Sequence, residues 1–285
     1  MPIELKNVSY TYAPGTAYAA EALNGVSLSI ADGEFVGVMG RTGCGKSTLI
    51  QLIAGLLEPS AGTVLVDGAD INGKKYDRDR LRRRVGVVFQ HPEYQLFETT
   101  VERDVAFGLR RLGWTGAQIR DSVKEALEAV GFDYEAVKDQ SPLQFSGGEK
   151  RRIAIAGVLA AKPGILILDE PIAGLDPLGR EAFLELVRKL NETGTTILMI
   201  SHNADALCRC ARRILVLQEG ELVLDGPAGA VFSRSGYLKQ LGIGAGQVRE
   251  AADLLAARGY EIPGDVCRYE DLLPHLIAIG KGAGR

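Results

Sequence analysis

The chain has 285 residues, with 33 basic and 36 acidic side chains for a formal net charge of −3, and 46% of its residues are hydrophobic. This charge balance argues against a dedicated nucleic-acid binder, and the apolar content excludes an intrinsically disordered chain. The longest apolar run, at residues 153–161, is about half of the ~20 residues that a membrane-spanning helix requires, so no transmembrane segment is predicted. The N-terminal residues lack a secretory signal pattern, and the 4 cysteines are expected to be free thiols.

In chain order, the hydrophobic pattern predicts an α/β protein. Period-two alternation or short apolar runs predict strands at residues 3–8, 23–30, 34–39, 63–67, 84–89, 164–168, 195–200, 214–217 and 221–224. Apolar residues spaced by three and four predict helices at residues 47–57, 101–112, 118–130, 153–161, 178–190, 246–258 and 269–279. Buried strands that alternate with a helix are typical of a parallel sheet. The predicted organisation is an α/β core, a helical insertion at about residues 90–160 and a small helical tail after residue 235.

A glycine-rich loop follows the nearly all-apolar strand at 34–39 and precedes a predicted helix. It matches the phosphate-binding pattern G-x-x-x-x-G-K-[ST] with Gly40, Arg41, Thr42, Gly43, Cys44, Gly45, Lys46 and Ser47. Glycines let successive backbone N–H groups turn toward phosphate oxygens, and the helix N-terminus adds partial positive charge. We expect Lys46 to reach the β- and γ-phosphates and Ser47 to ligate Mg²⁺. The alternative, a glycine-rich turn followed by chance by Lys-Ser, does not explain why strand, loop and helix coincide.

A second apolar strand, at residues 165–168, ends in two carboxylates, Asp169 and Glu170. In phosphate-loop enzymes an aspartate at the end of a neighbouring buried strand holds Mg²⁺, which is the role expected for Asp169. Glu170 comes next, where a carboxylate can orient and partly deprotonate the water that attacks the γ-phosphate. Taken alone, such an acidic pair would as readily cap a helix or face solvent. The complete phosphate loop favours the catalytic interpretation.

A third motif, formed by Ser146, Gly147, Gly148 and Glu149, precedes the helical run at 153–161. Ser146 and Glu149 have the spacing of a capping box, which accounts for the local structure. It does not account for two consecutive glycines, which weaken a helix unless bare backbone N–H groups must approach an anion. One nucleotide does not need two phosphate cradles about a hundred residues apart. We therefore expect a twofold dimer in which each chain's Ser-Gly-Gly segment covers the nucleotide held by the other.

These motifs resemble those of the ATP-binding subunits of ABC transporters, over about residues 3–235. Residues 40–48, which end at Thr48, are similar to the Walker A motif of that family, residues 165–170 to Walker B, and residues 146–149 to the signature motif. The resemblance implies that Asp176 belongs to the D-loop, that His202 is the switch histidine and that Gln90 is the Q-loop glutamine. It also implies that Tyr12 stacks on adenine.

The resemblance further implies a phosphate-loop NTPase fold with an antiparallel β subdomain and a helical subdomain, in a domain of residues 1–235. Residues 236–285 would form a C-terminal helical extension. The implied ligands are ATP and Mg²⁺, with Ser47, Gln90 and Asp169 as metal ligands. The implied catalytic residues are Glu170, His202 and Gln90.

Two stretches are similar to the ATPases of energy-coupling factor transporters, a subgroup of this family: residues 89–101, with the run Pro-Glu-Tyr-Gln-Leu-Phe, and the Pro-Gly-Thr insert after Tyr12. They indicate the second of the two ATPase types of that subgroup. The resemblance implies a second ATPase subunit, identical or not, a transmembrane scaffold subunit and a substrate-binding membrane subunit, with no nucleic acid as partner. The chain would lie at the cytoplasmic face of the membrane and power uptake of a vitamin or a transition-metal ion. Ile172 is a departure, since the family usually has a polar or small residue there, and we expect it to leave the site active.

Several alternatives compete with these assignments. Tyr12 alone would be a strand aromatic of the core, and His202 or Gln90 alone would be a solvated turn residue. An ABC-type ATPase that acts on DNA usually carries a coiled-coil insertion, and one that acts on ribosomes carries tandem cassettes; this sequence has neither. A phosphate-loop GTPase would be expected to carry an Asn-Lys-x-Asp motif, which this sequence lacks, and neither a GTPase nor a small-molecule kinase needs the Ser-Gly-Gly segment. A soluble ABC-type ATPase not linked to transport is the remaining alternative.

Overall fold

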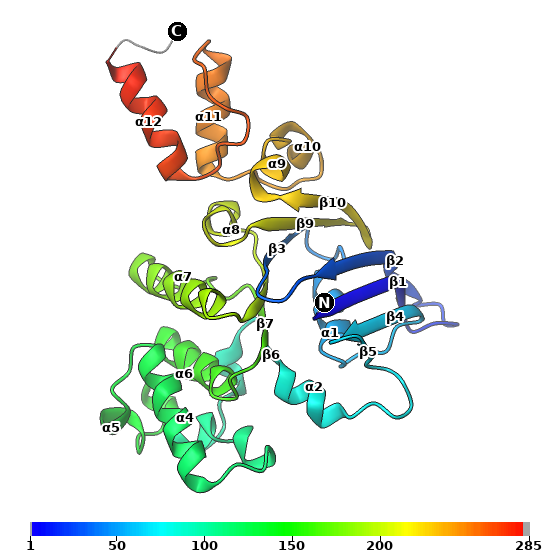
Figure 1. Cartoon of the computed structure of the whole chain (residues 1–285), viewed down its shortest axis with the longest axis vertical. Coiled ribbons are helices and arrows are strands. Elements are labelled where there is room, and N and C mark those ends of the chain that lie inside the picture. Colours follow the sequence, from blue (N-terminus) through cyan, green and yellow to red (C-terminus); the bar gives the residue numbers. More distant parts are fainter. Residues whose placement is uncertain (1, 282–285) are drawn as a thin grey trace.

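The computed structural model of the chain describes residues 2–281. Its strands form two sheets (Figure 1). The first sheet is antiparallel, in the order β2-β1-β4-β5, and comprises β1 (Ile3–Tyr12), β2 (Ala20–Ile30), β4 (Ala61–Val66) and β5 (Ala69–Asp70). The second, in the order β10-β9-β3-β8-β7-β6, is parallel except at the edge strand β10, and comprises β3 (Phe35–Met39), β6 (Val85–Val88), β7 (Ile165–Asp169), β8 (Thr196–Ile200), β9 (Arg213–Gln218) and β10 (Glu221–Pro227). The predicted α/β class and the antiparallel β subdomain are confirmed.

The helices fall into three groups along the chain. Those of the core are α1 (Lys46–Ile53), α2 (Arg78–Arg84), α7 (Pro177–Glu192), α8 (Ala204–Cys210), α9 (Ala228–Phe232) and α10 (Ser235–Gln240). The helical insertion contains α3 (Val101–Val105), α4 (Gly116–Ala129), α5 (Tyr134–Val137) and α6 (Gly147–Leu159), with the short 3-10 turns η1 (Pro92–Gln95), η2 (Leu109–Arg111) and η3 (Pro142–Gln144). The tail consists of α11 (Gln247–Ala257) and α12 (Tyr269–Gly280), which extend from the core as a pair (Figure 1).

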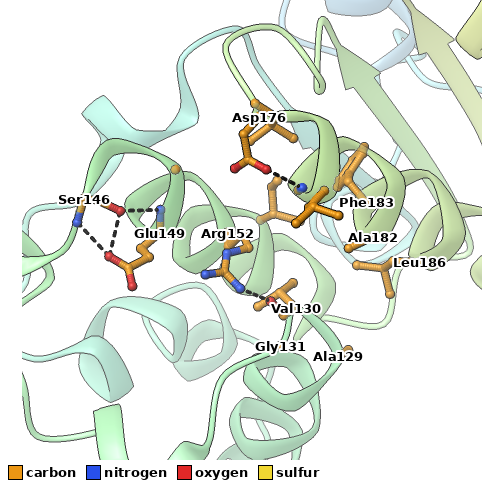
Figure 2. A pocket seen from close by; sticks show the side chains of 15 residues that line it. Ala129, Val130, Gly131, Ser146, Glu149, Arg152, Asp176, Ala182, Phe183 and Leu186 are labelled. Carbon is orange, nitrogen blue, oxygen red and sulfur yellow. Dashed lines mark hydrogen bonds between the residues drawn. The ribbon is translucent and has the colours of Figure 1, made fainter.

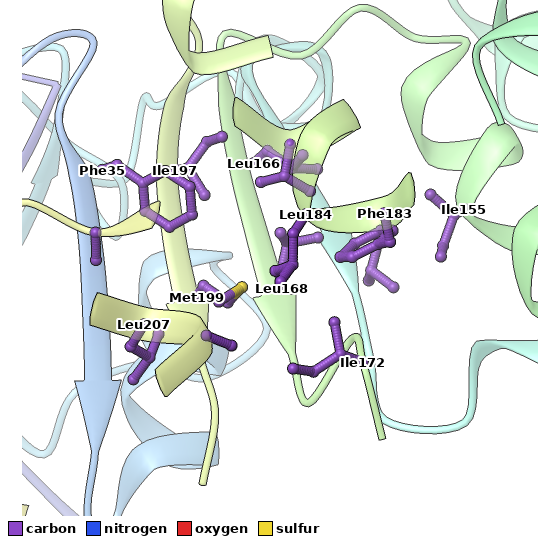
Figure 3. Close-up of a cluster of buried hydrophobic side chains, with 14 of the residues drawn as sticks. Phe35, Ile155, Leu166, Leu168, Ile172, Phe183, Leu184, Ile197, Met199 and Leu207 are labelled. Atoms are coloured by element: carbon purple, nitrogen blue, oxygen red, sulfur yellow. The ribbon is translucent and has the colours of Figure 1, made fainter. Parts of the chain in front are cut away.

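The core lies on both faces of the parallel sheet, because its central strands are buried along their whole length. Alternate side chains therefore enter opposite clusters. Phe35, Ile197 and Met199 face a cluster that includes side chains from α6, α7 and α8 (Figure 3). Val36 and Leu198 face a second cluster, built with α1 and the antiparallel sheet. Strands buried on both faces hold their carboxyl ends rigidly at one edge of the sheet, which is where ligands bind in open α/β sheets.

Two predicted helices differ in extent from the structure. The helix predicted at residues 101–112 ends at Val105, after which hydrogen bonds join residues three apart around Gly108, a poor helix former. The helix predicted at 47–57 ends at Ile53, because Gly55 adopts a φ of 67° and cannot continue it. The helices α2 and α8 were not predicted, since seven residues carry too little apolar periodicity.

The segment that precedes α11 packs on the core and so attaches the tail to it. Leu238, Ile243 and Ala245 are buried in the cluster that covers the face of α7 and α8. The helices α11 and α12 form a small cluster of their own around Ala252, Val266 and Leu272, and the domain boundary at residue 235 stays a prediction. All 4 cysteines are free thiols, as expected. Among residues 2–281, every helix is too short or too polar to cross a membrane.

Candidate active site

The loops after β3, β7 and β8 meet at one edge of the parallel sheet and enclose a cleft of 390 Å³. The structure brings together in this cleft eleven of the residues predicted from the sequence: Tyr12, Thr42, Gly43, Gly45, Lys46, Ser47, Thr48, Gln90, Asp169, Glu170 and His202. Four lining residues were not predicted, namely Ala20, Glu21, Ala22 and Ile200. The first three belong to β2, and only the folding of the antiparallel sheet over the loop places them there.

The glycine-rich loop leads from β3 into α1, as predicted. Gly45 has a φ of 103°, and a Cβ there would collide with the carbonyl of Ala22, so both the turn and the close approach require glycine. The Lys46 side chain is 8% exposed and crosses the loop, where its Nζ donates to the carbonyls of Gly40 at 2.7 Å and Arg41 at 2.8 Å. Gly40, Arg41 and Cys44 belong to the loop but do not line the cleft.

A hydroxyl and a carboxylate lie side by side at the floor of the cleft. Ser47 Oγ donates to Asp169 Oδ2 across 3.5 Å. Burial raises the pKa of Asp169, and the nearby Lys46 ammonium opposes that shift. Mg²⁺ prefers oxygen ligands and is usually held by one or two carboxylates together with substrate phosphates and water. This pair fits such a site, whereas no cluster of three or more carboxylate, histidine or cysteine ligands occurs in the described part of the chain.

Glu170 follows Asp169 in a strained backbone conformation, with a φ of +48° in the left-handed region. Its Oε1 lies 3.5 Å from His202 Nε2, and Ser201 Oγ donates to its Oε2 across 3.5 Å. Burial raises the pKa of the Glu170 carboxyl, and His202 opposes that shift. Its Oε1 is buried without a hydrogen-bond partner among the described residues and has His202 as its nearest ionisable neighbour, so its capacity to accept a hydrogen bond is unused.

Tyr12 stands at the end of β1 with 40% of its surface exposed, so it is not the core aromatic of the alternative interpretation. Its hydroxyl lies 3.1 Å from Thr48 Oγ1, and its ring packs edge-to-face on Tyr10 at 4.8 Å. The ring is thus held at the mouth of the cleft, where a planar ligand can stack on it.

The Ser-Gly-Gly segment does not line this cleft. Ser146 caps α6, its Oγ donating to Glu149 Oε2 at 2.7 Å, while the backbone N–H of Ser146 donates to the same carboxylate oxygen at 2.9 Å (Figure 2). These hydrogen bonds lower the pKa of Glu149. Ser146, Gly148 and Asp176 line a separate cavity of 590 Å³ between the helical insertion and α7 (Figure 2). Within one chain, the glycine-rich loop and the Ser-Gly-Gly segment therefore line different cavities.

Arg151 contacts the turn after β7, and the sequence analysis did not single it out. Its guanidinium donates to the carbonyls of Glu170 and Ala173. It stands in a run of three basic residues, Lys150-Arg151-Arg152, a pattern that is typical of a solvent-exposed surface. The Arg151 side chain is nevertheless buried, with 5% exposure. Its position four residues before Ile155 places it on the buried face of α6, a spacing that was available from the sequence.

Comparison with known proteins identifies the family. Residues 23–173 match the family model described as ABC transporter. The chain belongs to the ABC transporter family. This ABC transporter ATPase is 47% identical over 288 residues to the energy-coupling factor transporter ATP-binding protein EcfA2 of Symbiobacterium thermophilum, with 100% of both chains covered. It is 46% identical to EcfA2 of Clostridium perfringens, over 93% of this chain and 94% of the relative.

Solved structures of ABC transporter proteins share the fold. The ABC transporter ATPase matches cbiO1 of Clostridium perfringens, described as part of the transporter complex cbiONQ, with a TM-score of 0.73 and 36% identity, covering 84% of this chain and 94% of that one. It matches the ATP-binding cassette MJ0796, in a dimeric post-hydrolysis state with ADP and Pi, with a TM-score of 0.71 and 34% identity, covering 79% and 98%. The chain is therefore an ATP-binding subunit of a transporter, and its hydrolysis of ATP is coupled to transport.

Proposed function

We propose that this ABC transporter ATPase powers an energy-coupling factor transporter, which imports a vitamin or a transition-metal ion through a membrane partner. The observation that carries the proposal is the cleft at the ends of three parallel strands, where Lys46, Asp169 and Glu170 converge. The full-length similarity to EcfA2 proteins supports the subgroup, and the Pro-Gly-Thr insert supports the second ATPase type.

Nucleotide binding is the first task of the cleft. Lys46 and the backbone N–H groups of residues 40–48 hold the phosphates at the N-terminus of α1, and the half-exposed ring of Tyr12 stacks on adenine. Ser47 and Asp169, with Gln90 at the same cleft, hold Mg²⁺. When bound, the metal supplies positive charge beside the β- and γ-phosphate oxygens.

Hydrolysis requires a base beside the γ-phosphate. Glu170 orients the attacking water through its unpartnered Oε1 and accepts its proton, and His202, at 3.5 Å, supports the carboxylate and the phosphate. Because burial raises the pKa of Glu170, turnover is expected to decline as the pH falls through a value above the ordinary range of a glutamate.

A second subunit completes each site. Ser146, Gly147 and Gly148 cover the nucleotide held by the partner subunit, and Asp176 lies beside them on the same cavity. The separation of this cavity from the cleft within one chain supports such a composite arrangement. ATP binding closes the dimer and hydrolysis releases it, since the nucleotide contacts both subunits only in the closed state. The partner is a second copy of this chain or a non-identical ATPase.

The membrane subunits dock beside the segment that follows Gln90. Tyr94 is 82% exposed and Phe97 65% exposed, which leaves two large apolar side chains available to a partner. The proposed partners are a transmembrane scaffold subunit and a substrate-binding membrane subunit, which hold the ATPase at the cytoplasmic face of the membrane as a peripheral protein.

The decisive experiment compares Glu170→Gln with the wild-type chain and with Glu135→Gln, a surface control on α5. Glu170→Gln is expected to bind ATP and retain the closed dimer, with turnover about 10²- to 10⁴-fold lower, because the proton acceptor is lost. The control should hydrolyse ATP normally. Normal turnover in Glu170→Gln would contradict the assignment. Extraction of membranes in mild detergent should recover hydrophobic membrane subunits together with the chain. Absence of the chain from the membrane fraction would contradict the transport part of the proposal.

A further inference from the structure

Arg151 is a buried arginine that joins α6, here called the signature helix, to residues 170–173 after β7, here called the catalytic turn. It lies in the second turn of α6, the helix that Ser146 caps, and is 5% exposed. Its guanidinium donates to the carbonyl of Glu170 at 2.5 Å and to the carbonyl of Ala173 at 2.7 Å. One side chain on α6 thus spans the turn that leaves β7 and holds it at two points.

Two neighbouring carboxylates favour the charged form of the buried Arg151 side chain. Burial lowers the pKa of Arg151, and the carboxylates of Glu93 and Glu170 oppose that shift. Glu93 belongs to η1, just after Gln90, and η1 packs against α6. An oxygen of Glu93, Oε2, and the Nε of Arg151 are both buried without a hydrogen-bond partner among the described residues. Arg151 therefore stands where the signature helix, the segment after Gln90 and the catalytic turn meet.

The turn that Arg151 holds is one that needs support. Glu170 has a φ of +48°, a conformation that is unfavourable for a residue other than glycine and persists only when the surrounding contacts fix it. Its N–H donates to Ile200 O at 3.0 Å, which anchors the residue on the side of β8. Its carbonyl is anchored on the other side by Arg151, with a further bond from Ala173 N at 3.3 Å. Without the guanidinium, only the weaker bond within the turn would hold that carbonyl.

We propose that Arg151 is a positioning residue for hydrolysis: it fixes the backbone of Glu170 and so sets the direction of the catalytic carboxylate. The proposal rests on the proposed role of Glu170. Within the proposed dimer, α6 begins at the segment that covers the partner's nucleotide, and Arg151 in its second turn contacts Glu170 of its own cleft. Closure over one nucleotide is thereby transmitted to the catalytic residue that serves the other.

The test uses the full chain, purified with its membrane subunits, and three variants. Arg151→Met keeps the length of the side chain but removes all donors, whereas Arg151→Lys keeps the charge and cannot reach both carbonyls in the same planar geometry. Arg249→Met is the matched control, since Arg249 is 3% exposed and donates to the carbonyls of Pro263, Gly264 and Val266 in the tail, away from the cleft. The measurements are kcat, KM for ATP and the thermal midpoint.

Arg151→Met is expected to lower kcat by about 10- to 100-fold with KM for ATP changed less than about twofold, the pattern of a misplaced catalytic group in an intact binding cleft. Arg151→Lys should recover part of the lost kcat, and Arg249→Met should keep the wild-type kcat whatever its stability. In the Glu170→Gln background, Arg151→Met should still form the ATP-dependent dimer.

A wild-type kcat in Arg151→Met would overturn the proposal. If the methionine variant does not fold, a wild-type kcat in Arg151→Lys would overturn it instead. So would a loss that appears in KM alone. A Glu170→Gln variant with normal turnover would remove the proposed base, and the role of Arg151 would fall with it. A Glu170→Gln variant without turnover beside a fully active Arg151→Met would leave the proposed function standing and refute the positioning role alone.

Discussion

Replacing Ile172 by alanine should destabilise the protein without inactivating its site. Ile172 follows Glu170 by two positions, where the family resemblance led us to expect a polar or small residue, yet its side chain is 3% exposed. It lies in the large core cluster with Leu168 and Phe183 (Figure 3). The side chain faces the core and not the cleft, which explains how an apolar residue is accommodated at this position.

The magnitude follows from the burial. Alanine removes three carbon groups of Ile172, and at about 0.8 kcal/mol each their lost transfer free energy is about 2.4 kcal/mol. The cavity left beside Leu168 and Phe183 adds to this, so the total should fall at about 3–4 kcal/mol, within the range of ~2–5 kcal/mol for such truncations. Ile172→Val removes one methyl group and should cost about 1 kcal/mol.

The assay is equilibrium unfolding in urea, with the same nucleotide-free buffer for each variant. Leu56→Ala is the control, because Leu56 is 59% exposed and its truncation should change the free energy of unfolding by less than about 0.5 kcal/mol. ATP turnover of Ile172→Val should match the wild-type value. Equal stability of Ile172→Ala and Leu56→Ala would refute the core role of Ile172, and an inactive but folded Ile172→Val would show that the residue acts on the site itself.

Three further predictions follow from other contacts. Ser146→Ala removes the cap of α6 and its bonds with Glu149, so the free energy of unfolding should fall by about 1 kcal/mol and dimer formation with ATP should weaken, which chemical denaturation and gel filtration can measure. Burial raises the pKa of Glu170 above its value in the unfolded chain, so the native state loses stability as the pH rises through that raised pKa. Glu170→Gln cannot ionise, and its thermal midpoint at pH 7 should therefore be higher than that of the wild type. This difference should disappear at a pH below the ordinary range of a carboxyl group, where the wild-type side chain is also neutral. Asp205 on α8 accepts from the backbone N–H groups of Gln247 at 2.9 Å and Val248 at 3.2 Å, so Asp205→Ala should cost about 1 kcal/mol and speed hydrogen exchange at the start of α11, whereas unchanged exchange there would contradict this capping role.

Much of the site could be predicted because its elements are local in sequence. The glycine-rich loop, its flanking strand and helix, and the capping box of Ser146 are each set by hydrogen bonds and side-chain spacing within about ten residues. The apolar runs at β3, β7 and β8 predicted buried parallel strands, and parallel strands bring their carboxyl ends to one edge. Asp169 was predicted at the phosphate loop from the pattern of phosphate-loop enzymes and His202 from the family resemblance, and this rule explains why both line the cleft.

The sequence by itself determined the α/β class and the order of the motifs that carry Lys46, Asp169 and Glu170, since backbone propensity and residue type act over short distances. Only the tertiary structure decided that Ile172 is a core residue and that Arg151, in a run of three basic residues, is buried against the turn after β7. These outcomes depend on packing between segments far apart in the chain. Such contacts are selected by the shape and burial of the assembled elements, which no local pattern of residues records.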